Sequence, residues 1–87
     1  MRKIIEVDGS EEGFNAMLGE RVTVWCLNYI YAGKLVGVNT NDVKLEDASI
    51  VYETGSFNTP GYKDAQRLPG KFFYIRTALI ESYGLGK

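Results

Sequence analysis

Apolar and polar residues alternate along most of the chain, with a period of two that is typical of strands with one buried face. The first alternating run covers residues 21–27 and the second covers residues 30–38. Asn28 and Tyr29 separate the two runs, which predicts an antiparallel hairpin with a two-residue turn. The predicted cross-strand pairs are Leu27 with Ile30, Cys26 with Tyr31, Val24 with Gly33 and Val22 with Leu35.

The residues before this hairpin show apolar side chains at the spacing of a helix. Phe14, Met17 and Leu18 recur three and four residues apart, as on one face of a helix. Ser10 can cap such a helix and Gly19 can end it. We expect a short helix of about two or three turns.

Further segments complete the predicted strand order. After a polar turn at residues 39–42, apolar positions in residues 43–52 predict a third strand. Residues 54–70 contain three glycines and both prolines and predict a long loop between the third and fourth strands. Residues 71–77 are strongly β-prone, and residues 78–83 predict a tight turn into a last short strand.

The whole chain, residues 1–87, is short enough for a single domain, with residues 1–9 as a lead-in. A domain of this size is only marginally stable unless disulfides, metal or partners add stability. Cys26 is the only cysteine and histidine is absent, so neither an internal disulfide nor a zinc site is expected. The sequence predicts no metal and no cofactor, and oligomerisation remains as the stabilising factor.

The charge of the chain is nearly balanced, with ten lysines and arginines against eleven acidic residues. A domain that holds a long polyanion by Coulomb attraction usually carries a basic excess, so any nucleic-acid contact must be local. The start of the chain has no apolar run of the length that a signal peptide or a membrane span requires. With its single unpaired thiol, we expect a soluble cytoplasmic protein without a membrane partner.

No set of residues indicates catalysis. Without histidine, a serine, threonine or cysteine nucleophile would need a lysine or carboxylate base, and the sequence places none beside it. We therefore expect that the protein is not an enzyme.

Two groups of residues share an order and spacing beyond simple alternation. The first group is Leu18-Gly19, Val22-x-Val24-x-Cys26, Gly33-x-Leu35-x-Gly37-x-Asn39 and Val43-x-Leu45-Glu46-Asp47-Ala48. The second group is Tyr74-Ile75-Arg76-Thr77, followed by Ile80 and Tyr83. Together they resemble the two-part signature of the Sm-like (LSm) family, over residues 14–84. Thr77 stands where the family carries glycine.

The resemblance implies a mainly β, Sm-like fold, in which a short N-terminal helix precedes a strongly bent five-stranded antiparallel sheet, a small SH3-like barrel. It also implies a homo-oligomeric ring of about five to seven copies, closed by pairing the fourth strand of one copy with the fifth strand of the next. The residues predicted at this ring interface are Phe72, Phe73, Tyr74, Ile75, Ile80, Ser82 and Tyr83. A lone barrel with a covered edge strand is the alternative.

The resemblance further implies a site for single-stranded RNA near the pore, where an aromatic or histidine side chain and an arginine sandwich a base. The residues predicted to bind RNA are Asn39, Thr40, Asn41, Asp42, Arg76 and Thr77. The 39–42 turn is shorter than the family pattern and carries no aromatic residue, and Asp42 falls where an asparagine reads the base. An ionised Asp42 can only accept hydrogen bonds, and it could instead pair with Arg76.

Two functions are compatible with these observations. The first is an RNA-binding ring in RNA metabolism, and the alternative is a ring or barrel that acts as a scaffold for protein–protein interaction without RNA. Trp25 and Leu27 lie on the outer face of the predicted hairpin. We expect them to pack under the helix or the long loop, the other possibility being a partner contact.

Overall fold

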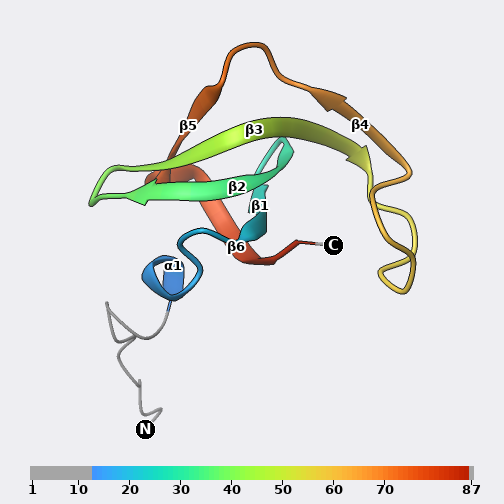
Figure 1. Cartoon of the computed structure of the whole chain (residues 1–87), viewed down its shortest axis with the longest axis horizontal. Coiled ribbons are helices and arrows are strands. Elements are labelled where there is room, and N and C mark those ends of the chain that lie inside the picture. The colour runs from blue at the N-terminus through green and yellow to red at the C-terminus, as the bar shows by residue number, and fades with distance from the viewer. Residues whose placement is uncertain (1–12, 87) are drawn as a thin grey trace, which may run out of the picture.

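The structure, a computed structural model, describes residues 13–86. They form one helical turn, six strands and a short 3-10 helix (Figure 1). The elements are α1 Gly13–Ala16, β1 Arg21–Cys26, β2 Ile30–Val38, β3 Asp42–Glu53, β4 Asp64–Arg67, β5 Phe72–Arg76, η1 Thr77–Leu79 and β6 Ile80–Leu85. The predicted lead-in and Ser10 lie outside the described residues, and the predicted helix is described over α1 alone. No helix in this part of the chain has the length and apolar character needed to cross a membrane.

All strand pairs of the sheet are antiparallel, in the order β4-β3-β2-β1-β6, with β5 also paired to β3. β4 pairs with one half of β3 and β5 with the other half. Between them, the Leu68 N–H donates to the Ala48 carbonyl at 2.8 Å, and the Asp47 N–H donates to the Lys71 carbonyl at 3.0 Å. β4 and β5 therefore line β3 as one interrupted strand, joined by the arch above β3 in Figure 1.

The prediction of a mainly β, antiparallel fold is confirmed, with six strands instead of five. The additional strand is β4, which occupies part of the loop predicted at residues 54–70. Every side chain of β4 is exposed, so this strand has no buried face. A strand without a buried face shows no apolar alternation, and the sequence pattern could not reveal it.

The predicted register of the β1–β2 hairpin is wrong by two residues. The structure pairs Val22 with Gly33 and Val24 with Tyr31, and the Cys26 N–H donates to the Tyr29 carbonyl at 2.9 Å, so that this bond encloses Leu27 and Asn28 instead of the predicted Asn28 and Tyr29. A two-residue turn of the usual hairpin type requires positive φ, and no residue of this turn adopts it. A slip of two residues leaves every side chain on its predicted face, so the inward-facing set is unchanged.

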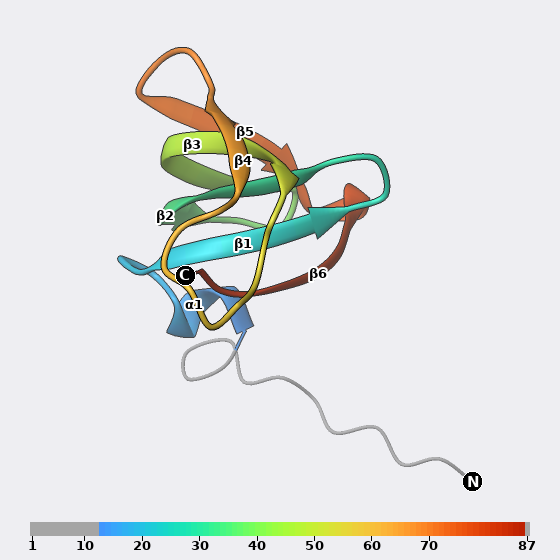
Figure 2. The ribbon, with the colours of Figure 1, turned by 90° about the vertical axis from the view of Figure 1, so that its right-hand side faces the viewer.

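The buried core lies on the inner side of a strongly bent sheet (Figure 2). Its members are Val22, Val24, Leu35, Val43, Leu45, Ala48 and Ile75, with Phe14 and Met17 from the helical segment packed against them. The register of β2 and β3 shifts between Ala32 and Lys34, at Gly33, and again between Leu35 and Gly37, and irregularities of this kind bend a strand. A Cβ at Gly33 would lie 3.1 Å from the Ala48 Cα, so only glycine permits this approach without a shift.

The sheet does not close on itself. In the described chain β6 pairs only with β1, while β4 and β5 pair only with β3. The barrel part of the predicted fold is therefore not confirmed. Both margins of the sheet instead present unpaired strand edges.

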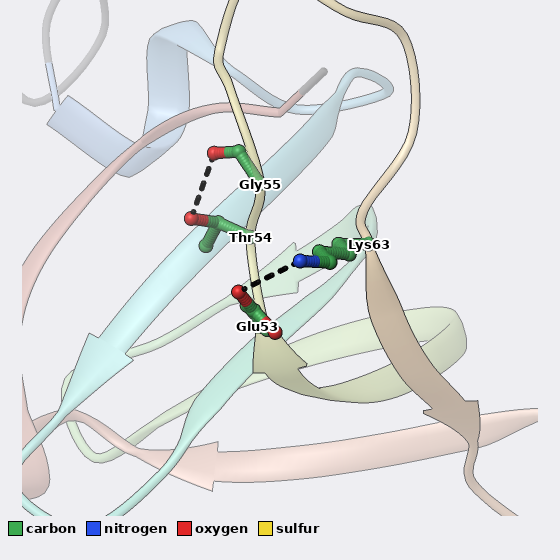
Figure 3. Close-up of polar contacts among 4 residues, drawn as sticks. All are labelled: Glu53, Thr54, Gly55 and Lys63. Atoms are coloured by element: carbon green, nitrogen blue, oxygen red, sulfur yellow. Dashed lines mark hydrogen bonds and ion pairs between the residues drawn. The ribbon is translucent and has the colours of Figure 1, made fainter.

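The 54–63 loop folds back across the outer face of β1. The Trp25 and Phe57 rings lie 6.3 Å apart, and the hydroxyls of Tyr62 and Thr23 share a hydrogen bond. The base of the loop is held by a 3.4 Å ion pair between Lys63 and Glu53 (Figure 3). The expectation that Trp25 packs under the long loop is thus confirmed, whereas Leu27 stays 78% exposed at the hairpin tip.

We predict that Gly33→Ala destabilises the fold, because the added methyl group would also lie 3.2 Å from the Leu45 Cβ and the Glu46 carbonyl oxygen. Overpacking of this kind costs about 1–3 kcal/mol. Gly84→Ala is the matched control, since a Cβ there has no atom within 4 Å and should change the free energy of unfolding by about 0.5 kcal/mol or less. Urea denaturation at equal protein concentration measures both, and equal midpoints for the two variants would contradict the prediction.

Candidate nucleic-acid interface

The 39–42 turn is held by its own first side chain. The Asn39 Oδ1 accepts hydrogen bonds from the N–H groups of Asn41 at 2.7 Å and Asp42 at 2.8 Å. The Asn39 N–H donates to the Asp42 carbonyl at 3.0 Å. An amide oxygen accepts such bonds as a carboxylate oxygen does, so an asparagine at position 39 holds a compact turn.

Thr77, at the start of η1, ties this turn to the end of β5. Its N–H donates to the Asn41 carbonyl at 2.8 Å. Its hydroxyl lies 2.9 Å from the Thr40 carbonyl and 3.1 Å from the Asn41 carbonyl. Glycine, which the family carries at this position, has no hydroxyl to make these bonds, so Thr77 adds a link between the two segments. The residues predicted to bind RNA therefore lie together at one end of the sheet.

Arg76 lies directly opposite Asp42 in the β3–β5 register. Across residues 13–86, however, the ion pairs join Lys63 with Glu53 and Arg67 with Asp47, and Arg76 takes part in none. The proposed structural pairing of Arg76 with Asp42 is thus not formed. The Arg76 side chain is exposed beside the turn, where its guanidinium can contact a ligand.

The residues predicted for the ring interface lie on β5 and β6, the two strands at opposite margins of the sheet. Several of their side chains belong to the core of their own subunit. Ile75 is buried, Phe73 and Ile80 pack partly against the core, and the Tyr83 ring stacks on Phe14 with centroids 3.7 Å apart. The unpaired backbone edges of these two strands and their more exposed side chains remain available for contact with another copy.

A cavity of about 340 Å³ lies beside β5, between that strand and the tip of the β1–β2 hairpin. Its lining is Cys26, Leu27, Asn28, Tyr29, Tyr31, Phe73, Tyr74, Ile75, Arg76 and Leu79. The Tyr31 ring lies 6.3 Å from that of Tyr29 and 5.9 Å from that of Phe73, so aromatic rings dominate one wall. Burial raises the pKa of the Cys26 thiol, which keeps it protonated and makes it a small apolar group.

Sequence reasoning missed this cavity. The only signal in the sequence was a cluster of aromatic residues on both sides of the first hairpin turn and in the β5 segment. Because these segments are far apart in the chain, only the folded sheet brings them together.

Comparison with known proteins identifies a fold that the chain shares with a solved structure, but no sequence family that includes the chain. No protein-family model matches the sequence. No curated protein matches it either. Among solved structures, the chain is similar to the Sm protein of Pyrococcus abyssii in complex with a uridine heptamer. The TM-score is 0.62 at 17% identity, over 84% of this chain and 92% of the other. The chain therefore has an Sm-like fold.

We predict that Thr77→Val loosens the 39–42 turn, because valine keeps the branched shape and loses the hydroxyl proton that the two neighbouring carbonyls share. The loss should cost about 0.5–1.5 kcal/mol of stability. Amide hydrogen exchange should become faster at Asn41 and Asp42. Thr40→Val is the control, since within residues 13–86 the Thr40 side chain makes no hydrogen bond; equal exchange in both variants would rule out the link.

Proposed function

We propose that this protein is a non-enzymatic, cytoplasmic, Sm-like subunit that assembles into a closed ring and binds single-stranded RNA near Arg76 and the 39–42 turn. One observation carries the proposal: the chain shares its fold with an Sm protein whose solved complex contains a uridine heptamer. The free edges of β5 and β6 support assembly, and the exposed Arg76 supports RNA contact.

The side chains at the two margins of the sheet support a head-to-tail assembly. On β6, Tyr83 and Leu85 pair with the buried Val24 and Val22, so both point to the core-facing side of the sheet. Leu85 is nevertheless 65% exposed, because nothing in the described chain covers that margin.

The opposite margin offers the matching surface. On β5, Phe73 and Ile75 pair with Leu45 and Val43, so they also face the core side, and they line the aromatic cavity. When β6 of one copy pairs with β5 of the next, its apolar side chains come to this cavity. Such a head-to-tail contact joins two different surfaces, and it pairs the β5 and β6 edges of every copy when about five to seven copies close a ring.

RNA binding at this site depends on local contacts. The net charge of the chain is −1, so Coulomb attraction over the whole surface contributes little. Arg76 can stack on a base and carry charge at once, and a ring repeats it in every copy around the pore. The rigid turn beside it offers the Asn41 side chain, whose amide both donates and accepts hydrogen bonds.

A scaffold without RNA is the second candidate, and the composition of the turn favours it. The turn has no aromatic side chain to stack on a base, and the Asn39 oxygen is already bonded to two N–H groups. A ring of Asp42 carboxylates would also repel phosphate groups. In this alternative the ring presents its loops to protein partners.

For assembly, we predict a mass in light scattering that corresponds to about five to seven chains at micromolar concentration. Leu85→Glu should reduce this mass towards that of one chain, because a carboxylate would enter the apolar cavity of the next copy. Leu18→Glu, which places the same charge at a 46% exposed leucine outside β5 and β6, should still assemble. A wild-type mass near 9.7 kDa would refute the ring.

For RNA, we predict salt-sensitive binding of U-rich or A-rich oligonucleotides to the assembled protein. Arg76→Ala should weaken binding about tenfold or more and leave the mass unchanged, since one stacked base contributes about 1–3 kcal/mol. Arg21→Ala removes an equally charged, exposed side chain from β1 and should bind like the wild type. An intact ring that shows no salt-sensitive binding would leave the scaffold as the function.

A further inference from the structure

The outer face of β5 carries an exposed row of side chains that neither the core nor strand pairing uses. Phe72, Tyr74 and Arg76 alternate along the strand with the inward-facing Phe73 and Ile75. Phe72 is 38% exposed and Tyr74 is 60% exposed. Neighbours two apart on a strand are about 6.6–6.8 Å from each other, so the row offers evenly spaced aromatic and guanidinium groups.

Lysine ammonium groups lie over these rings. The Lys44 Nζ lies 4.0 Å from the centre of the Phe72 ring and 5.8 Å from that of Tyr74. The Lys71 Nζ lies 5.4 Å from the Phe72 centre. All three are cation–π distances, so both ammonium groups lie at the aromatic surface. We call Phe72, Tyr74, Arg76, Lys44 and Lys71 the outer strip.

A glycine makes the position of Lys44 possible. Gly37 pairs with Lys44 across β2 and β3. A Cβ at Gly37 would lie 3.2 Å from the Lys44 Cβ and 3.6 Å from its Cδ, so a side chain there would crowd the lysine stem. The missing side chain leaves that stem free to lie across β2 while its ammonium group reaches the β5 rings.

The outer face of β3 and β5 carries a local excess of positive charge, although the chain as a whole does not. Lys34 pairs with Glu46 across β2 and β3, Asp42 lies opposite Arg76, and Glu46 lies opposite Phe72. The lysines and arginine of the face, Lys34, Lys44, Lys71 and Arg76, outnumber its carboxylates, Asp42 and Glu46. Positive charge beside exposed rings is complementary to a ligand with both phosphates and flat bases.

We propose that the outer strip is a second contact surface for single-stranded nucleic acid, on which successive bases stack on Tyr74 and Phe72 while Lys44 and Lys71 contact the phosphates. The inference rests on the proposed function and extends it, because Arg76 joins the strip to the 39–42 turn. A strand that leaves the turn at Arg76 continues along β5 towards Phe72. Exposed aromatic residues on a sheet bind two or three bases in this manner in other RNA-binding folds.

Ring closure does not cover this surface. Strand pairing uses the backbone edge of β5, which lies in the plane of the sheet, whereas the rings of Phe72 and Tyr74 project from its outer face. The core-facing side chains of a neighbouring β6 would reach the cavity, which Tyr74 and Arg76 also border, whereas the Tyr74 ring lies 5.8 Å from the Lys44 Nζ, with the rest of the strip. The strip therefore stays open to a ligand in the assembled protein.

Tyr74→Ser tests the proposal, and Tyr52→Ser is its matched control. Tyr52 is 58% exposed on β3 of the same sheet, away from β5. We expect Tyr74→Ser to weaken binding of an RNA of about ten nucleotides by about tenfold, and Tyr52→Ser to leave it unchanged. Binding of a uridine trimer, which reaches only the turn and Arg76, should be the same in both. Lys44→Gln should lower the slope of log affinity against log salt by about one.

The outcomes of these experiments distinguish the outer strip from the proposed RNA site at Arg76 and the 39–42 turn. If Arg76→Ala abolishes binding of both RNAs while Tyr74→Ser binds the longer RNA like the wild type, the strip is refuted and the proposed function stands. If Tyr74→Ser lowers the mass of the assembly instead of the RNA affinity, the outer face is an interface between copies and the inference is wrong. If the wild type binds neither RNA, the proposed function and the strip both fail. Circular dichroism and the solution mass show whether each variant is folded.

Discussion

The close approach of β2 to β3 at Gly33 is the constraint on which the rest of the structure depends. A Cβ at this position would be within 3.2 Å of the Leu45 Cβ, so any larger residue would push the strands apart. On the facing strand, Asp47 adopts a positive φ of 52°, which marks the same place as an irregularity of β3. A sheet bent here encloses its core on one side and carries β5 and β6 to separate margins.

The bend also divides one edge of β3 into a protected part and an open part. β4 is exposed and polar, and the Arg67 guanidinium pairs with the Asp47 carboxylate at 2.6 Å, features that discourage pairing with a further strand. β5 follows on the same edge but carries aromatic residues, has no proline and lies beside an apolar cavity. An incoming strand would therefore be accepted at β5 and discouraged at β4. This division limits the register in which copies can join.

Alternation along the chain was sufficient to predict the inner face of the sheet, because burial on one face leaves a period of two in the sequence. Val22, Val24 and Leu35 are buried as predicted, and Arg76, Thr77 and the 39–42 turn lie together as the resemblance implies. The features that could not be predicted from the sequence do not produce such a period. β4 has no buried face, the hairpin register depends on the φ angles of its turn, and the absent pairing of Arg76 with Asp42 depends on side-chain conformation.

A nearly neutral chain can bind a polyanion only by concentrating its contacts, and the proposed contacts of this chain all lie along β5 and the adjoining turn. Fixed hydrogen bonds from Asn39 and Thr77 order the turn beside Arg76 before a ligand arrives, so little conformational entropy is lost there on binding. Stacking on Tyr74 and Phe72 does not depend on net charge and tolerates any base, whereas the lysines add a limited electrostatic component. Affinity built in this way should depend less on salt than that of a basic domain, and more on how many copies of β5 one strand can reach. Assembly would then determine binding strength, because each added subunit contributes another short contact without raising the charge of the chain.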